Sequence, residues 1–304
     1  ICSFINEIRK ALIGMGIEGR IYNLQGIGVG ARADKLFDGE IIYSHKEKLI
    51  ETENILFDSK SKKTLNELIR CRITGNYEYL LPILSPDQYF PNDIVKLTKH
   101  ETFIDGGAFD GDTIKEFLLK IDGNYKQIYS FEPDKQNYQQ LINFVSRENL
   151  MDVDCINKGL YDANKTLSFF SFGTASALQS TNKQKNSFDG IEYNVNEEVE
   201  VISLDSFFQS NMSEEEGVKM PTMIKMDIEG SEVMAIKGAR NIISEFKPKL
   251  AICVYHKATD LWDIPLLLKS INPNYNIFLR HHYSPNFCRE DYHADIQETI
   301  CYAI

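Results

Sequence analysis

Apolar residues in the last two thirds of the sequence form short runs separated by amphipathic stretches. This alternation predicts buried strands joined by helices, and therefore an α/β fold with a mostly parallel, doubly wound sheet and right-handed crossovers. The strands are expected at residues 102–104, 127–131, 153–156, 221–226, 249–255, 275–280 and 298–303. No helical pattern separates the last two runs, so the final strand is expected to be antiparallel.

The same periodicity predicts helices at 113–121, 134–145, 231–246 and 260–271. Residues 166–172 are expected to form an antiparallel addition to the sheet, and residues 198–204 alternate like an edge strand. The polar loop 173–181 and the acidic insert 186–198 lie between these two stretches.

Residues 1–84 lack this regular alternation and are predicted to form an N-terminal accessory region, either α/β or helical, beside a domain at 85–304. Residues 6–15 are weakly helical, whereas 20–24 and 41–43 resemble strands. Residues 45–57 and 59–74 are predicted to form charged amphipathic helices, the second ending at Gly75. The stretch GIGVG at 26–30 lacks the spacing of a nucleotide-binding loop and is only a weak candidate for a ligand site.

The stretch TFIDGGAFDGDT at 102–113 predicts a ligand-binding loop between a buried strand and a helix. Asp105 ends the strand, Gly106 and Gly107 permit positive φ and close approach of the backbone, and Gly111 leaves the helix entry without a Cβ. The helix beginning near Asp112 presents free N–H groups to the ligand. The alternative is an ordinary strand–turn–helix connection.

The spacing of this loop, D-x-G-x-x-x-G, differs from the G-x-G-x-x-G of dinucleotide-binding loops. A dinucleotide needs bare backbone N–H groups for its pyrophosphate. S-adenosylmethionine instead carries an amino-acid end and a sulfonium, beside which carboxylates are favourable. The spacing therefore favours S-adenosylmethionine, and a dinucleotide-dependent oxidoreductase is the alternative.

Polar side chains gather where the predicted strands end, which is the edge at which open α/β sheets bind ligands. Glu132, followed by Pro133, ends the second strand after the loop and can accept both hydroxyls of a ribose. A single histidine at such a position is more often a hydrogen-bonding partner than a catalyst. The whole set nevertheless indicates a functional site: Asp105, Glu132, Asn157, Asp227, Glu229, His256, His281 and His282.

Four stretches, FIDGGAFDGDT, IYSFEPD, the GTAS loop before EVEVISLDSF, and IKMDIEGSE, together resemble the FkbM family of S-adenosylmethionine-dependent methyltransferases over about residues 85–304. The resemblance implies a class I methyltransferase (Rossmann-like) sheet and O-methyl transfer to a hydroxyl of a sugar, glycan or related natural product. It fixes no catalytic residue. The predicted donor-binding residues are Tyr89, Asp105, Gly106, Gly107, Ala108, Phe109, Asp110, Asp112, Thr113, Glu132, Pro133, Gly159, Asp227 and Glu229.

Methyl transfer to a hydroxyl is an in-line displacement that benefits from alignment and from a positioned base. His256 is the first candidate for the base because an ordinary imidazole has a pKa near 6.5. Asp227 is the second, since it ends the strand nearest the expected donor. Alternatively, Asp227, Glu229 and His256 hold a divalent metal that acidifies the hydroxyl. Loop hydrogen bonding explains the Asp-x-Glu pair equally well, so a metal is not favoured.

The aromatic, proline-containing segment 77–90 precedes the ligand loop and is interpreted in two ways. Tyr89 and Phe90 either cover the donor as part of a lid or pack as a linker between the two parts of the chain. An aromatic face over a sulfonium would be favourable. Both interpretations stay open at this point.

The balance of 33 basic against 44 acidic side chains, with a net charge of −11 and a pI near 5.1, argues against a nucleic-acid partner. Six cysteines without a C-x-x-C pair fit reduced thiols and a cytoplasmic protein. No apolar run reaches membrane-spanning length, and an Ile at position 1 leaves open that a longer chain precedes it. A non-catalytic module of a glycan-assembly complex ranks last, because it would not need the polar edge.

Overall fold

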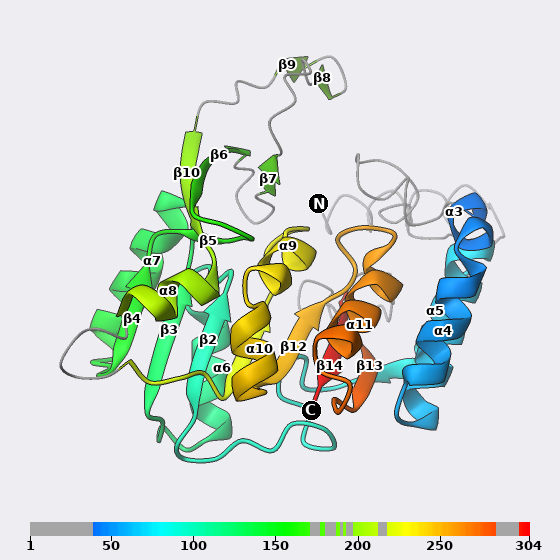
Figure 1. Cartoon of the computed structure of the whole chain (residues 1–304), viewed down its shortest axis with the longest axis horizontal. Helices are drawn as coiled ribbons and strands as arrows, with labels where there is room; N and C mark the ends of the chain where they lie inside the picture. The colour runs from blue at the N-terminus through cyan, green and yellow to red at the C-terminus, as the bar shows by residue number, and fades with distance from the viewer. Residues whose placement is uncertain are drawn as a thin grey trace, which may run out of the picture.

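The computed structural model describes residues 39–170, 177–179, 187–188, 191–192, 197–211, 218–283 and 298–304. Its centre is an eight-stranded sheet in the order β1-β13-β14-β12-β11-β2-β3-β4 (Figure 1). Only β14 runs antiparallel to its neighbours, β12 and β13, which confirms the predicted sheet. The strands are β1 (Leu84–Ser85), β2 (Thr102–Gly106), β3 (Gln127–Phe131), β4 (Val153–Ile156), β11 (Met223–Met226), β12 (Lys249–Cys253), β13 (Ile277–His282) and β14 (Thr299–Ala303).

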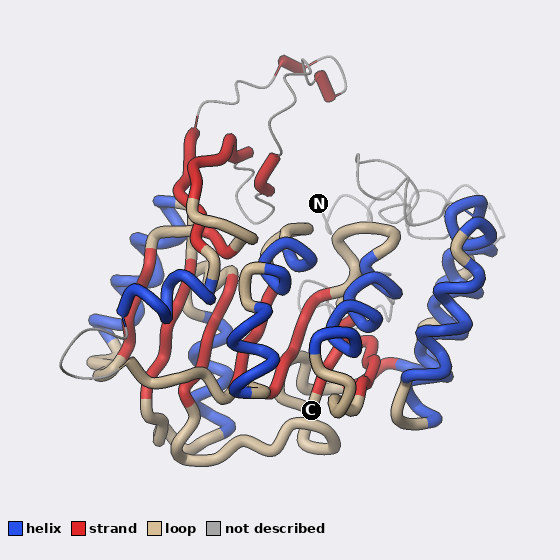
Figure 2. Tube along the Cα trace, viewed as in Figure 1, coloured by secondary structure: helices blue, strands red, loops and turns tan. Residues whose placement is uncertain are grey.

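Helices cover both faces of this sheet, and successive strand residues supply the two cores (Figure 2). Phe103 and Met223 pack into one core with α6 (Asp112–Lys120) and α7 (Lys135–Arg147). Ile104 packs into the other core, which is closed by α8 (Leu204–Asn211), α9 (Glu232–Lys237), α10 (Arg240–Phe246) and α11 (Asp260–Ile271). Burial on both faces explains the nearly continuous apolar strand sequences.

The N-terminal helices pack into the same core as α11. They are α3 (Gly39–Ser44), α4 (Lys46–Ile55) and α5 (Ser59–Thr74). Leu49 and Leu68 share a hydrophobic cluster with Trp262. The helix α5 ends at Gly75, whose left-handed φ of 67° confirms the predicted stop. The boundary at residue 84 stays a prediction, and two short 3₁₀ turns, Tyr77–Tyr79 and Leu81–Ile83, lead up to it.

The predicted strand at 41–43 is wrong, because these residues belong to the helix α3. Ile42 is buried there against the neighbouring helices, so tertiary packing overrides the β preference of an isoleucine pair. The predictions for residues 6–15, 20–24 and 26–30 lie outside the described residues.

A small second sheet has the order β5-β10-β6-β7, with β5 (Gly159–Leu160), β6 (Lys165–Phe170), β7 (Ala177–Gln179) and β10 (Glu197–Ile202). The antiparallel pairing expected for 166–172 occurs between β6 and β10, but in this sheet rather than in the main one. The predicted edge strand is also wrong, since β10 lies between β5 and β6. Apolar and polar residues alternate along β10 because one face of the strand is buried, and Val199 and Val201 lie on that face. A short ribbon, β8 (Ser187–Phe188) and β9 (Ile191–Glu192), stands apart.

The single helix expected at 231–246 is two helices, α9 and α10, separated at Gly238. A Cβ at Gly238 would lie 2.1 Å from the carbonyl oxygen of Tyr161. The Gly238 carbonyl also accepts the N–H of Asp205 at 2.8 Å. The close approach of another segment therefore requires a glycine where α9 ends, and a helical periodicity cannot reveal such a contact. No helix in the described ranges is long and apolar enough to cross a membrane.

Candidate active site

The loop after β2 is held between the ends of two neighbouring strands, β11 and β3. The N–H groups of Gly107 and Ala108 donate to the Phe131 carbonyl at 2.9 and 3.1 Å, and the N–H of Asp227 donates to Gly106 at 3.0 Å. Gly107 has a φ of 75°, and a Cβ there would lie 1.9 Å from the Asp227 carbonyl oxygen. Glycine is therefore required at this position on both conformational and steric grounds.

A buried lysine, Lys225, supports this loop from beneath. Its Nζ donates to the carbonyl oxygens of Gly107 at 2.7 Å and Gly106 at 3.2 Å, and lies 3.1 Å from Asp105 Oδ1. Burial lowers the pKa of Lys225, but Asp105 and Asp227 outweigh it and raise the pKa above its ordinary value. Burial raises the pKa of Asp105 to about 6, against the opposing effect of Lys225. The loop thus lies over a fully buried ion pair.

Glu132, at the end of β3, closes the other side of the loop. Its two carboxylate oxygens accept the N–H groups of Phe109 and Asp134, each at 2.9 Å. Burial raises the pKa of Glu132 to about 7 despite these two hydrogen bonds. Asn157 donates to the carbonyls of Glu132 at 2.8 Å and Pro133 at 3.2 Å, so the end of β3 is fixed as well.

Asp227, at the end of β11, is a shared acceptor for two tyrosines. The Tyr89 hydroxyl donates to Oδ2 at 2.8 Å, and the Tyr255 hydroxyl donates to Oδ1 at 3.2 Å. Burial raises the pKa of Asp227, but His256, Lys225 and the Tyr89 hydrogen bond together lower it below its ordinary value. Asp227 is therefore an oriented, ionised carboxylate beside the loop.

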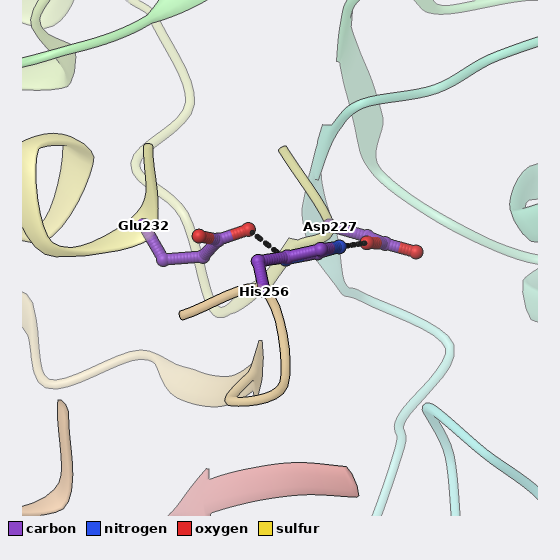
Figure 3. A group of neighbouring side chains, drawn as sticks. All are labelled: Asp227, Glu232 and His256. Carbon is purple, nitrogen blue, oxygen red and sulfur yellow. Dashed lines mark ion pairs between the residues drawn. The ribbon is translucent and has the colours of Figure 1, made fainter. Parts of the chain in front are cut away.

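His256 lies between carboxylates, with one ring nitrogen toward each of the two drawn in Figure 3. Nδ1 is 2.8 Å from Glu232 Oε1, while Nε2 is 3.3 Å from Asp227 Oδ1 and 3.6 Å from Glu229 Oε2. Burial lowers the pKa of His256, but these carboxylates outweigh it and raise the pKa to about 10. The ring therefore carries a proton at neutral pH, and the argument for a base with an ordinary pKa does not apply to this state. A base role for His256 stays a prediction.

The remaining predicted donor-binding residues also lie at the loop. Gly159, in β5, precedes Leu160, whose side chain packs on Gly106. Asp112 begins α6 and accepts the N–H of Thr113 at 2.7 Å. Asp110 is half-buried in the turn before it, and Glu229 follows β11 in a left-handed conformation with a φ of 56°.

Two histidines of the predicted polar edge do not join this site. His281 Nδ1 lies 2.9 Å from the Thr299 hydroxyl, and His282 contacts the Ser85 carbonyl at 3.0 Å and the Tyr302 hydroxyl at 2.8 Å. Both rings are buried. They bridge β1, β13 and β14 and are structural.

Three residues of the site escaped the sequence reasoning. Lys225 could have been recognised from the sequence, because it is a lysine inside an otherwise apolar strand. Glu232 lies four residues after Ile228, whose N–H it accepts at 2.9 Å, and the helical pattern at 231–246 did not single it out. Tyr255 sits next to His256, two residues beyond the end of β12, and its hydroxyl reaches Asp227 only in the folded chain.

A profile of the Methyltransferase FkbM domain matches residues 105–300. The chain belongs to this methyltransferase family. The match covers every residue of the loop and both carboxylate-bearing strand ends, Glu132 and Asp227. It confirms the resemblance on which the fold and the class of enzyme were predicted.

A solved structure, that of methyltransferase FkbM from Methylobacillus flagellatus KT, resembles the chain over 98% of its length and over 70% of that protein, with 26% sequence identity and a TM-score of 0.74. Two other structures align less well. A putative methyltransferase from Streptococcus mutans in complex with SAH has 12% identity and a TM-score of 0.36, covering 68% of this chain and 90% of that one. Fibrillarin from Aeropyrum pernix with bound S-adenosyl-L-methionine has 10% identity and a TM-score of 0.38, covering 69% and 70%. No curated protein matches the sequence.

Proposed function

We propose that this methyltransferase takes its methyl group from S-adenosylmethionine and transfers it to a hydroxyl of a sugar, glycan or related natural product. The observation that carries the donor assignment is the loop after β2, fixed between Asp227 and Glu132. A loop held by its own backbone at the carboxyl edge of the sheet can accept a ligand without rearranging.

Glu132 is the proposed partner of the donor's ribose. Each of its oxygens already accepts one backbone N–H, and a carboxylate oxygen has room for a second hydrogen bond. The ribose hydroxyls can therefore bind without displacing the contacts that position Glu132. Its location at the end of the strand next to the loop supports this assignment.

Asp105 and Asp227 supply negative charge around the methionine part of the donor. Asp105 is buried beneath the loop, and Lys225 balances only part of the combined charge. A cationic sulfonium and an ammonium group suit such an environment because nearby carboxylates attract both positive charges.

Tyr89 belongs to the proposed donor pocket, because its hydroxyl binds Asp227 and its ring lies 5.2 Å from the Lys225 ammonium. Phe90 is almost fully buried and packs against Phe103 and Phe117. These contacts support a fixed wall rather than an opening lid.

The acceptor's hydroxyl is proposed to approach Asp227 and His256, the two residues predicted to handle its proton. Tyr89 and Tyr255 orient Asp227, while Glu232 orients His256. Such orientation is what an in-line displacement requires. The polar, acid-lined edge supports a hydroxyl-rich acceptor over an apolar one, and the proposed location of the enzyme is the cytoplasm.

The experiment that tests this function is transfer of a labelled methyl group from S-adenosylmethionine onto a panel of glycans and polyols. We expect label in an alkali-stable ether on at least one acceptor. Failure of every hydroxyl acceptor by a protein that binds the donor would refute the acceptor class. A rise in melting temperature with NAD but not with S-adenosylhomocysteine would instead support a dinucleotide-dependent oxidoreductase.

A further inference from the structure

The turn that follows β12 carries His256 and is fixed by side chains on two sides. Within the turn, the N–H of Lys257 donates to Asp260 Oδ2 at 2.9 Å, and the N–H of Asp260 donates to the Lys257 carbonyl at 3.1 Å. From outside the turn, Arg72 Nη1 donates to the Ala258 carbonyl at 2.8 Å. Arg72 lies in α5, 186 residues earlier in the chain. The N-terminal helices therefore reach the backbone just beyond His256.

Arg72 is a costly residue for packing alone, because it is a buried charge. It is 1% exposed, and its Nε has no hydrogen-bond partner. Burial lowers the pKa of Arg72 to about 10, against the opposing charge of Asp260, so the guanidinium is still charged at neutral pH. Among the described residues, the Ala258 carbonyl is the one acceptor bound to this guanidinium. A buried charge with incomplete hydrogen bonding is destabilising, so the packing of α5 alone does not explain an arginine here.

The position of the His256 ring depends on this turn. The turn supplies the ring, whereas α9 supplies Glu232 and the end of β11 supplies Asp227. Nδ1 lies 2.8 Å from Glu232 Oε1, and Nε2 lies 3.3 Å from Asp227 Oδ1. Because the attraction between charges weakens with distance, a shift of the turn would change both contacts at once.

We propose that Arg72 is a positioning residue of the active site, which holds the turn so that the His256 ring stays between Asp227 and Glu232. The family profile matches residues 105–300, so this role falls to a helix that the profile does not include. The proposal rests on the proposed function, because Arg72 acts only through the predicted role of His256 at the acceptor.

The protonation of His256 reports where the ring lies. The charged groups around it come from α9, the loop after β11, α11 and the turn itself, and they are Glu232, Asp227, Glu229, Asp260 and Lys257. The ring of Tyr255 also packs on it, with an uncharged hydroxyl because burial raises the pKa of Tyr255.

Two effects of removing Arg72 on the pKa of His256 have opposite signs. Loss of the positive charge by itself raises this pKa, since a nearby cation disfavours the imidazolium. Displacement of the ring from its carboxylates lowers this pKa, since those carboxylates favour the imidazolium. The direction of the shift therefore separates positioning from simple electrostatics.

The test is an NMR titration of the full chain labelled at its histidines, with His256→Ala used to assign the signal of His256. We expect the midpoint to fall by about one pH unit or more in Arg72→Met, the scale of losing a close carboxylate. A smaller fall is expected in Arg72→Lys, which keeps the charge but lacks the guanidinium fork. Calorimetry on the same samples should show affinity for S-adenosylhomocysteine close to that of the wild type.

Arg280→Met is the matched control. Arg280 is another buried arginine that anchors α5, with Nη2 2.7 Å from Asp58 Oδ2, but it lies on β13. The control should leave the His256 midpoint unchanged.

An unchanged or raised midpoint in every Arg72 variant that is folded by circular dichroism would overturn the proposal. An equal fall in Arg280→Met would also overturn it, because the effect would then come from looser packing of α5. Binding of S-adenosylhomocysteine with an unchanged midpoint refutes the positioning role alone, whereas absence of that binding in the wild type refutes the proposed function.

Discussion

The Tyr89 hydroxyl donates a 2.8 Å hydrogen bond to Asp227, 138 residues further along the chain. This contact joins the segment before β2 to the end of β11. It orients the carboxylate that borders the loop.

Tyr89→Phe removes this hydrogen bond while keeping the ring. We expect a loss of about 1–3 kcal/mol in the free energy of unfolding, because the acceptor is charged, and a measurable loss of affinity for S-adenosylhomocysteine. Denaturant unfolding and calorimetry measure the two effects. Tyr275→Phe is the matched control, since its hydroxyl donates at 2.7 Å to the Pro248 carbonyl, before the start of β12. A loss of donor affinity in the control equal to that in Tyr89→Phe would contradict the assignment.

Gly107→Ala should abolish the packing of the loop on β11. The added methyl group would lie 1.9 Å from the Asp227 carbonyl oxygen, in a residue with a φ of 75°. Gly75→Ala provides the control, because Gly75 has a similar φ of 67° but nothing within 4 Å of the added carbon. We expect a loss of about 1 kcal/mol in the control and a much larger one, with no donor binding, in Gly107→Ala. Equal melting temperatures for the two variants would contradict the close approach of Gly107 to the Asp227 carbonyl.

Lys225→Met should destabilise the protein by about 3–5 kcal/mol, because it leaves Asp105 buried without its cation. The double variant Lys225→Met/Asp105→Asn should recover part of this loss in urea unfolding. If the losses in unfolding free energy caused by the two single changes simply added up in the double variant, the 3.1 Å ion pair between Lys225 and Asp105 would not hold the loop.

Donor affinity should depend on pH through Glu132, whose pKa is raised to about 7 by burial. The ribose hydroxyls require the ionised carboxylate as acceptor, so affinity for S-adenosylhomocysteine should fall as the pH drops below about 7, approaching tenfold per pH unit. Calorimetry between about pH 5.5 and 8.5 measures this slope. The Glu132→Gln variant lacks this titration and should show a flatter profile, and a slope shared by the variant would assign the titration elsewhere.

The same raised pKa has an opposite effect on the stability of the ligand-free protein. A carboxyl group with a higher pKa in the folded than in the unfolded state binds more protons when folded. Its contribution to stability is therefore complete below the ordinary value of 4.5 and is lost as the pH rises through about 7. Donor affinity and ligand-free stability should thus change in opposite directions across this range.

Periodicity predicted the main sheet because β2, β3 and β11 are buried on both faces and read as apolar runs. The loop was also predictable, since the positive φ values of Gly107 and Gly111 demand glycines that are visible in the sequence. The predictions that failed concern features that depend on contacts between segments far apart in the sequence. The break between α9 and α10 lies at Gly238, where the backbone of Tyr161 leaves no room for a side chain.

The candidate site shows the same contrast between features visible in the sequence and features set by tertiary contacts. The location of Asp227, Glu132 and His256 at one edge of the sheet was predictable, because the carboxyl ends of neighbouring parallel strands meet there; their roles stay predictions. The raised pKa of His256 could not be foreseen, because it depends on Glu232, a residue of α9 that lies 24 positions earlier in the chain and whose carboxylate is 2.8 Å from the ring.

The central claim is that the loop at residues 105–113 and Glu132 bind S-adenosylmethionine. Calorimetric titration of the full chain with the product S-adenosylhomocysteine, in parallel for wild type and Glu132→Ala, tests it most directly. We expect binding at one site by the wild type and a loss of about 1.5–3 kcal/mol in the variant, the scale of hydrogen bonds to a charged group. Absence of binding by the wild type, or equal affinity for the two proteins, would contradict the claim.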